Sequence, residues 1–259
     1  MRSLRFRFLD FMFLLTIPAW PQQVQTSEAP ASAPKDPQAV AVLNQALTVG
    51  GGLSAIATID DYTATGSVTY YLPDEGSGPV TVRESGLAQL RMDAQLPGGT
   101  RSEAMYDGEI RISERGVTST SWDPPPFYPG RIVVPTAFMA AASRGPQFSL
   151  TYNGTAVIDG QVAFDIEVQL VVPAPETIRY REGLVMHLFV DMNTLQVVMM
   201  QDVDRRNQIR QVRYSDYRTV NGAQVPFAIS EQIASHQTWA MKLSQINFNT
   251  GLQDSDFIL

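Results

Sequence analysis

The chain has 259 residues, of which 44% are hydrophobic and 17% are charged, and its net charge is −7. This acidic balance argues against nucleic-acid binding and against a polybasic contact with anionic lipid headgroups, because both need a concentrated basic surface. The sequence contains no cysteine, which excludes disulfides, thiolate nucleophiles, iron–sulfur clusters, cysteine-held zinc and a lipid-modified N-terminal cysteine.

Residues 1–27 are predicted to be a signal peptide. Arg2, Arg5 and Arg7 form a basic start, and residues 11–19 (FMFLLTIPA) form an apolar core that is too short to span a bilayer. An apolar N-terminal helix of the fold and an uncleaved anchor are the alternatives. We expect the mature protein to be periplasmic or secreted.

A Pro-, Ala- and Ser-rich stretch follows, and we expect residues 28–35 to be a disordered linker in front of a single domain, residues 36–259. A helix is predicted next, because Asp36 is a favourable N-cap and Pro37 suits the first helical position. Val40, Leu43 and Leu47 recur at helical spacing, and the glycines at 50–52 end the pattern.

After residue 60 the hydrophobic pattern changes to alternation, which indicates strands. We expect roughly nine to eleven strands joined by hairpins, with one further helix at 135–143 that has a proline at its first position. The run at 123–130 (DPPPFYPG) is predicted to be a stiff loop. Tight turns are predicted at Asp107-Gly108, Asn153-Gly154, Asp159-Gly160 and Asn221-Gly222. Hairpins without helical crossovers predict an antiparallel sheet, and so many strands must curl or close.

Two strands break the alternation, because residues 184–190 and 197–200 are apolar on both faces. A strand with water on one side should alternate, so a helix, a second sheet, an apolar ligand or a partner must cover both faces. Ordinary core, a lipid-lined cavity and a partner interface all remain open. The candidate apolar lining of a ligand site comprises Phe164, Leu184, Met186, Leu188, Val197 and Met199.

No catalytic constellation is visible in the sequence. The two histidines, His187 and His236, are far apart, and His187 lies in an apolar strand where a packed or hydrogen-bonded role is expected. No Gly-x-Ser-x-Gly elbow and no phosphate-binding glycine loop occur. We therefore expect no enzyme activity, no catalytic residue, no metal site and no cofactor.

The C-terminal third resembles the LolA-like family of outer-membrane lipoprotein-sorting proteins. The resemblance rests on residues 188–195 (LFVDMNTL), residues 214–227 (YSDYRTVNGAQVPF), residues 246–249 (INFN) and residues 254–257 (DSDF). The middle block is a turn signature between two strands rather than an active site, and Gly222 supplies the positive φ that the turn needs.

The resemblance implies a mainly β (α+β) fold. Its strongly curved antiparallel sheet would form an incomplete barrel, with an N-terminal helix and one or two further helices over the concave face. It also implies a periplasmic carrier that shields lipid or lipoprotein acyl chains in an apolar hollow. Such a carrier's partners would be a lipid or an acylated protein, with an inner-membrane donor and an outer-membrane acceptor. The alternative is a non-catalytic structural or protein-interaction module of the envelope with a packed interior.

Overall fold

The computed structural model describes residues 32–71, 76–107, 109–122, 132–171, 185–204 and 206–259. The predicted signal peptide, the proline-rich loop at 123–130 and Leu184 lie outside these residues, as does half of the predicted Asp107-Gly108 turn. Within them, no helix is long and apolar enough to cross a membrane.

Three α-helices occur in the described part of the chain: α1 (Pro37–Val49), α2 (Gly52–Ile56) and α3 (Pro135–Arg144). The predicted cap of α1 is confirmed, because the Asp36 carboxylate accepts a hydrogen bond from the Gln38 backbone N–H at 2.7 Å. Gly51, at φ 116°, turns the chain out of α1 and into α2. The predicted second helix is α3, with Pro135 in its first turn.

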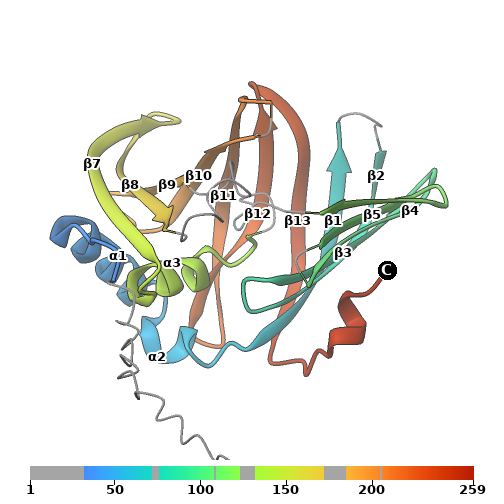
Figure 1. Ribbon diagram of the computed structural model, residues 1–259, viewed down its shortest axis with the longest axis horizontal. Coiled ribbons are helices and arrows are strands. Elements are labelled where there is room, and N and C mark those ends of the chain that lie inside the picture. The colour runs from blue at the N-terminus through green and yellow to red at the C-terminus, as the bar shows by residue number, and fades with distance from the viewer. Residues whose placement is uncertain (1–31, 72–75, 108, 123–131, 172–184, 205) are drawn as a thin grey trace, which may run out of the picture. The chain divides into compact units, whose positions relative to one another are not determined.

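Thirteen antiparallel strands form one sheet in the order β6-β5-β4-β3-β2-β1-β13-β12-β11-β10-β9-β8-β7 (Figure 1). The strands are β1 (Asp61–Tyr70), β2 (Gly76–Ser85), β3 (Gln89–Leu96), β4 (Gly99–Tyr106), β5 (Glu109–Glu114), β6 (Val117–Trp122), β7 (Phe148–Ile158), β8 (Gln161–Leu170), β9 (Val185–Asp191), β10 (Val197–Val203), β11 (Ile209–Val220), β12 (Ala223–Ile233) and β13 (His236–Phe248). The sheet has more strands than the nine to eleven expected. It is not closed into a barrel: β6 and β7 are its two edges, and α3 lies between them in the chain.

Bulges bend the long strands. The β1–β13 register shifts between Thr65 and Gly66, and a Cβ on Gly66 would come within 2.2 Å of the Lys242 carbonyl oxygen. The predicted turn at Asn153-Gly154 is wrong, because these residues form a bulge inside β7, with Gly154 at φ 96°. The turns predicted at Asp159-Gly160 and Asn221-Gly222 are confirmed, and all four residues have positive φ.

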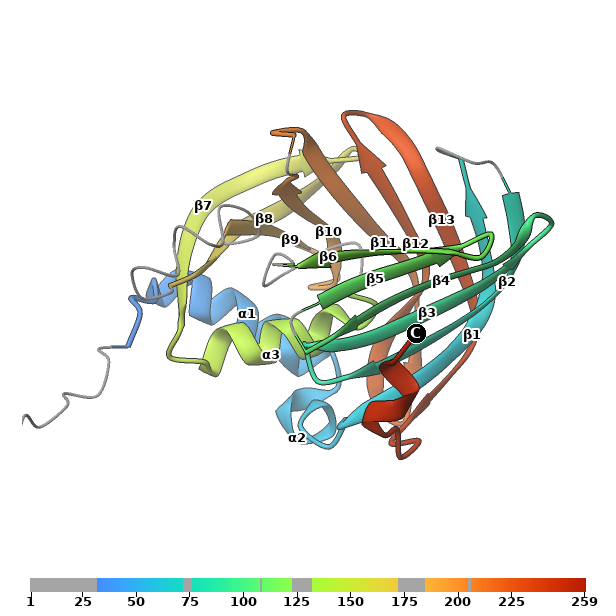
Figure 2. The same cartoon turned by 45° about the vertical axis from the view of Figure 1, so that its right-hand side comes forward.

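One face of the sheet, here called the inner face, carries Val82, Met186, Tyr214 and Met241 and packs against the helices. Figure 2 shows α1 and α3 lying across the hollow side of the curved sheet. Leu43 and Leu47 of α1 and Phe138 and Met139 of α3 are buried in the same apolar cluster as the inner-face side chains. The predicted arrangement, a curved sheet with helices over its concave face, is therefore confirmed.

Part of the expected linker is ordered. Ala33 is buried, and its N–H donates to the Pro146 carbonyl at 2.8 Å. Lys35 forms a parallel bridge with Leu150 of the edge strand β7. Its Nζ donates to the Ser143 carbonyl at 2.6 Å, at the C-terminal end of α3 where carbonyls lack helical partners. The segment from Ala33 therefore holds α3 and β7 together.

Candidate functional site

A pocket of about 440 Å³ lies between α2, α3 and the adjacent ends of β1 and β2. Its volume is within the range of small-molecule sites, roughly 300–1,000 Å³. The side of α3 that borders it carries Ala137, Ala140 and Ala141, and the short methyl side chains leave the space open. The other lining residues are Ile56, Ala57, Ile59, Asp60, Asp61, Tyr62, Glu84, Gly86, Leu87, Val134, Arg144, Gly145 and Gln147.

The floor of this pocket holds a buried carboxyl group, Glu84 of β2. Glu84 is 7% exposed, and the hydroxyl of Tyr62 on β1 donates a hydrogen bond to its Oε2. Burial raises the pKa of Glu84 to about 8, although the hydrogen bond from Tyr62 opposes this shift. Glu84 is therefore mostly a neutral carboxylic acid at pH 7, which keeps the floor of the pocket free of charge.

Three further charged residues line the pocket, and one of them, Asp61, is 8% exposed. Asp61 has its carboxylate fully engaged, since it accepts hydrogen bonds from the Thr250 N–H at 2.6 Å, the Gly251 N–H at 3.1 Å and the Leu252 N–H at 3.3 Å. Asp60 and Arg144 are exposed at the rim. The pocket therefore combines apolar walls with a neutral Glu84 and a hydrogen-bonded Asp61, and its two exposed charges are Asp60 and Arg144.

The predicted lining residues occupy three different environments. Met186, Leu188 and Val197 are together in the main core, each at most 1% exposed, and none of them borders the pocket. Phe164 is partly buried against the same core, and Leu184 lies outside the described residues. Helix and strand side chains thus cover the inner side of these strands.

Met199 is separated from that group because it points to the opposite face of the sheet. The β9–β10 register shifts between Val197 and Met199, so Val197 pairs with Val190 and Met199 pairs with Phe189. The extra residue reverses the face of everything that follows it. Met199 packs in a small outer-face cluster with Ala163 and Phe189. Both faces of β9 and β10 are therefore covered, as predicted, but by two distinct apolar clusters.

The fold itself has known counterparts. A crystal structure described as that of an outer-membrane lipoprotein-sorting protein domain, from Vibrio parahaemolyticus, is similar over 85% of this chain and 96% of its own, with a TM-score of 0.50 and 10% identity. A LolA-superfamily protein from Nitrosomonas europaea matches over 83% of this chain and 97% of its own, with a TM-score of 0.52 and 12% identity.

The chain has a LolA-like fold. A protein of the DUF1329 family from Desulfovibrio piger shares it as well, at a TM-score of 0.50 and 11% identity over 85% of this chain and 97% of its own. The sequence matches no protein-family model and no curated protein. The resemblance predicted from the C-terminal third is thus confirmed at the level of the fold.

On this LolA-like scaffold, sequence reasoning missed the pocket, but a signal for its floor was present. Val80, Val82 and Glu84 share the alternation of β2, and Val80 and Val82 are buried on the inner face. A glutamate at the third position of an inward-facing series predicts a buried carboxyl group. The contribution of Tyr62 depends on the β1–β2 pairing, in which Tyr62 lies opposite Glu84.

A second hollow of about 540 Å³ lies on the outer face, over β11, β12 and β13. Small side chains line much of it, including Ala228, Ser230 and Ala240, and Arg213, Asp216 and Lys242 border it. Because charged and polar groups line this hollow, it suits an apolar chain less well than the helix-covered pocket does.

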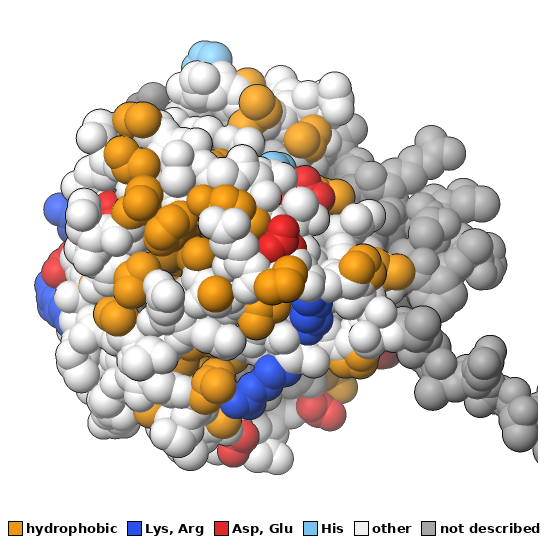
Figure 3. Space-filling view, turned by 90° about the vertical axis from the view of Figure 1, so that its left-hand side faces the viewer, with side chains coloured by type: hydrophobic (Ala, Val, Ile, Leu, Met, Phe, Trp, Pro, Cys, Tyr) orange, Lys and Arg blue, Asp and Glu red, His pale blue; other side chains and the backbone are white. Residues whose placement is uncertain are grey.

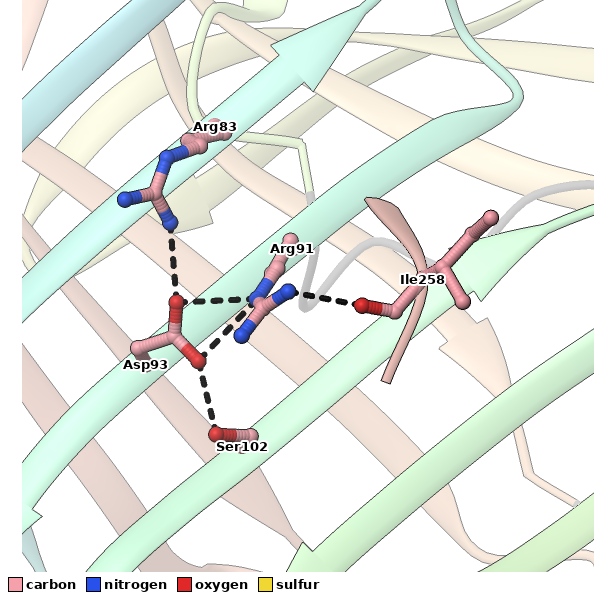
Figure 4. Close-up of polar contacts among 5 residues, drawn as sticks. All are labelled: Arg83, Arg91, Asp93, Ser102 and Ile258. Atoms are coloured by element: carbon pink, nitrogen blue, oxygen red, sulfur yellow. Dashed lines mark hydrogen bonds and ion pairs between the residues drawn. The ribbon is translucent and has the colours of Figure 1, made fainter. Parts of the chain in front are cut away.

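Polar contacts on the outer face hold the end of the chain (Figure 4). Asp93 of β3 accepts hydrogen bonds from Arg83 at 2.8 Å and from the Ser102 hydroxyl at 2.6 Å, and it pairs with Arg91. Arg91 also donates to the Ile258 carbonyl at 2.7 Å. This network fastens the C-terminal 3-10 turn (Asp254–Phe257) to the sheet, and Phe257 is buried beneath it.

The histidine prediction is confirmed for His187, whose Nδ1 is 2.8 Å from the Asp165 carboxylate on the outer face. Its ring stacks on Phe189 with 6.2 Å between ring centroids. Among the described residues, no group of three or more histidine, aspartate or glutamate side chains is placed to hold a metal ion.

Proposed function

We propose that this protein is an envelope carrier that shields the acyl part of a lipid or of a lipidated protein in the pocket between its helices and sheet. The observation that carries the proposal is the pocket of about 440 Å³, with its alanine-lined helix and uncharged floor, in a LolA-like fold. Transfer of each methylene from water into such a pocket is favourable by ~0.8 kcal/mol. Binding alone accounts for this function, so no catalytic residue is invoked.

The cellular setting follows from the predicted signal peptide. A carrier in the periplasm would take its cargo from an inner-membrane donor and deliver it to an outer-membrane acceptor. The fold neighbours include a protein described as an outer-membrane lipoprotein-sorting domain, which supports this setting.

The proposal is tested with a variant whose larger side chain fills the pocket. The Ala141→Phe variant places a ring on the pocket side of α3 and should abolish uptake of acylated probes, because the ring takes the space of the chain. The control is Ala41→Phe, on the exposed side of α1, where uptake should stay at the wild-type level. Native mass spectrometry of the purified protein, mixed with single-chain and two-chain phospholipids, reads out the bound mass. Equal uptake by both variants would remove the pocket from the binding site.

A second candidate function is a protein-interaction module, favoured by one observation on the edge of the sheet. Val157 on β7 and Val162 on β8 pair across the hairpin and are 70% and 43% exposed. Hydrophobic side chains gather on the side of the molecule where β7, β8 and α1 lie (Figure 3). A Val157→Glu variant that keeps lipid uptake but loses a binding partner would support this function in addition to carriage.

A further inference from the structure

Three carboxyl side chains and one arginine side chain line the pocket. Glu84 is neutral near pH 7 and bonded to Tyr62, and Asp61 is occupied by the 250–252 loop. Two charged side chains remain at the rim, Asp60 and Arg144. In the described part of the chain, neither side chain has a hydrogen-bond or ion-pair partner.

The backbones that carry these two charges are fixed. The Asp60 N–H donates to the Asn249 side chain at 2.9 Å, and its carbonyl accepts from the Gly86 N–H at 3.3 Å. Arg144 ends α3, and the following Gly145 N–H donates to the Ala141 carbonyl at 2.7 Å. Fixed backbones with free charged ends keep one anion and one cation beside the entrance to an apolar pocket.

The size of the pocket limits what enters it. A volume of about 440 Å³ is in the lower half of the small-molecule range, roughly 300–1,000 Å³. One acyl chain fits this space better than the several chains of a full lipoprotein anchor. The cargo is therefore expected to be a single chain with a polar end that stays at the mouth.

We infer that the pocket selects a single-chain amphiphile with a zwitterionic head, whose phosphate contacts Arg144 and whose ammonium group contacts Asp60. This inference rests on the proposed carrier function and names its cargo class. An arginine guanidinium binds phosphate through paired charged hydrogen bonds, and a carboxylate accepts from an ammonium group in the same way. A head with both charges satisfies both rim residues, whereas a purely anionic head would leave Asp60 facing like charge.

The experiment compares three probes of equal chain length below their micellar concentrations: lysophosphatidylethanolamine, lysophosphatidylglycerol and the free fatty acid. Affinities are measured by titration calorimetry on the full-length chain and on the variants Asp60→Asn, Arg144→Gln and, as a matched control, the exposed Arg206→Gln. Wild-type protein should bind the ethanolamine lipid about tenfold more tightly than the glycerol lipid.

The variants separate the two contacts. Asp60→Asn should remove the preference by weakening only the ethanolamine lipid, and Arg144→Gln should weaken both phospholipids about tenfold and keep their order. Arg206→Gln should match wild type. An unchanged preference in Asp60→Asn, or unchanged affinities in Arg144→Gln, would overturn the headgroup assignment while Ala141→Phe still blocks binding. If wild type binds none of these probes but takes up two-chain phospholipids in a way that Ala141→Phe blocks, the single-chain assignment fails and the carrier function stands. If it takes up neither class, the carrier function itself fails.

Discussion

Charged groups on the two faces of the sheet are stabilised in different ways. On the inner face, the Asp202 and Arg210 side chains are 0% and 6% exposed and bond to each other, with Arg210 Nε 2.8 Å from Asp202 Oδ1. On the outer face, Asp93 and its partners Arg83 and Arg91 keep 16–30% of their side chains in contact with solvent. Inner-face charges must be neutralised within the protein, whereas outer-face charges share that task with water.

Glu84 and Asp93, on the neighbouring strands β2 and β3, show how this difference affects the pKa of a carboxyl group. Burial raises the pKa of Glu84 to about 8, since its one hydrogen bond, from Tyr62, does not offset the loss of solvent. Burial also raises the pKa of Asp93, but hydrogen bonds from Ser102 and Arg91 outweigh it and hold that pKa below its usual value. Glu84 has one donor and is 7% exposed, whereas Asp93 has several donors and keeps 16% of its side chain in contact with solvent. Donors and solvent together therefore keep Asp93 charged, while burial dominates at Glu84.

The largest expected effect comes from breaking the buried pair on the inner face. Arg210→Ala leaves the Asp202 carboxylate buried without its cation, so we expect the free energy of unfolding to fall by about 3–5 kcal/mol. Urea denaturation followed by circular dichroism measures the change. The control is Asp216→Asn, which removes the charge from the exposed pair with Arg218 and should leave stability unchanged within error. A small loss in Arg210→Ala would show that water reaches Asp202.

A smaller, pH-dependent effect is expected for Glu84→Gln. Because the folded-state pKa of Glu84 is raised, the folded state holds a proton that the unfolded state releases above its usual pKa. Wild type should therefore lose stability as the pH rises from about 5 to about 8, by at most about 1.4 kcal/mol per pH unit. The glutamine variant cannot ionise and should lack this component.

Denaturation at pH 5, 6.5 and 8 for both proteins isolates the effect, since titrations elsewhere cancel in the difference. The gap between the two proteins should shift in favour of glutamine as the pH rises. A gap that stays constant with pH would show that Glu84 is already ionised in the folded protein, and that the pocket floor is charged.

Much of the fold could be predicted from local signals. Asp36 and Pro37 marked the start of α1, Pro135 marked α3, and Asn221-Gly222 marked the turn between β11 and β12. These features depend on residues close in sequence, so a pattern is enough to predict them. The incomplete barrel followed from the number of strands together with the family resemblance.

The candidate site was harder to predict because it depends on register. One extra residue between Val197 and Met199 moves Met199 to the outer face, and nothing in an apolar run shows where a bulge occurs. The pocket joins α2 and α3 to β1 and β2, segments that only the tertiary fold brings together. Strand alternation therefore identified buried positions without showing which of them border a cavity.

The smallest effect is expected on the outer face. Asp93→Asn keeps the shape of the side chain but removes its charge, so the contacts to Arg83 and Arg91 weaken and stability should fall by about 1–2 kcal/mol. Because Arg91 also holds the Ile258 carbonyl, amide exchange in residues 254–258 should accelerate more than exchange in β9. Asp159→Asn, in an outer-face pair whose aspartate is 68% exposed, should change neither. Faster exchange spread evenly over the sheet would mean that Asp93 stabilises the whole fold rather than the C-terminal turn. Charged groups on the two faces would then differ only in their exposure to solvent.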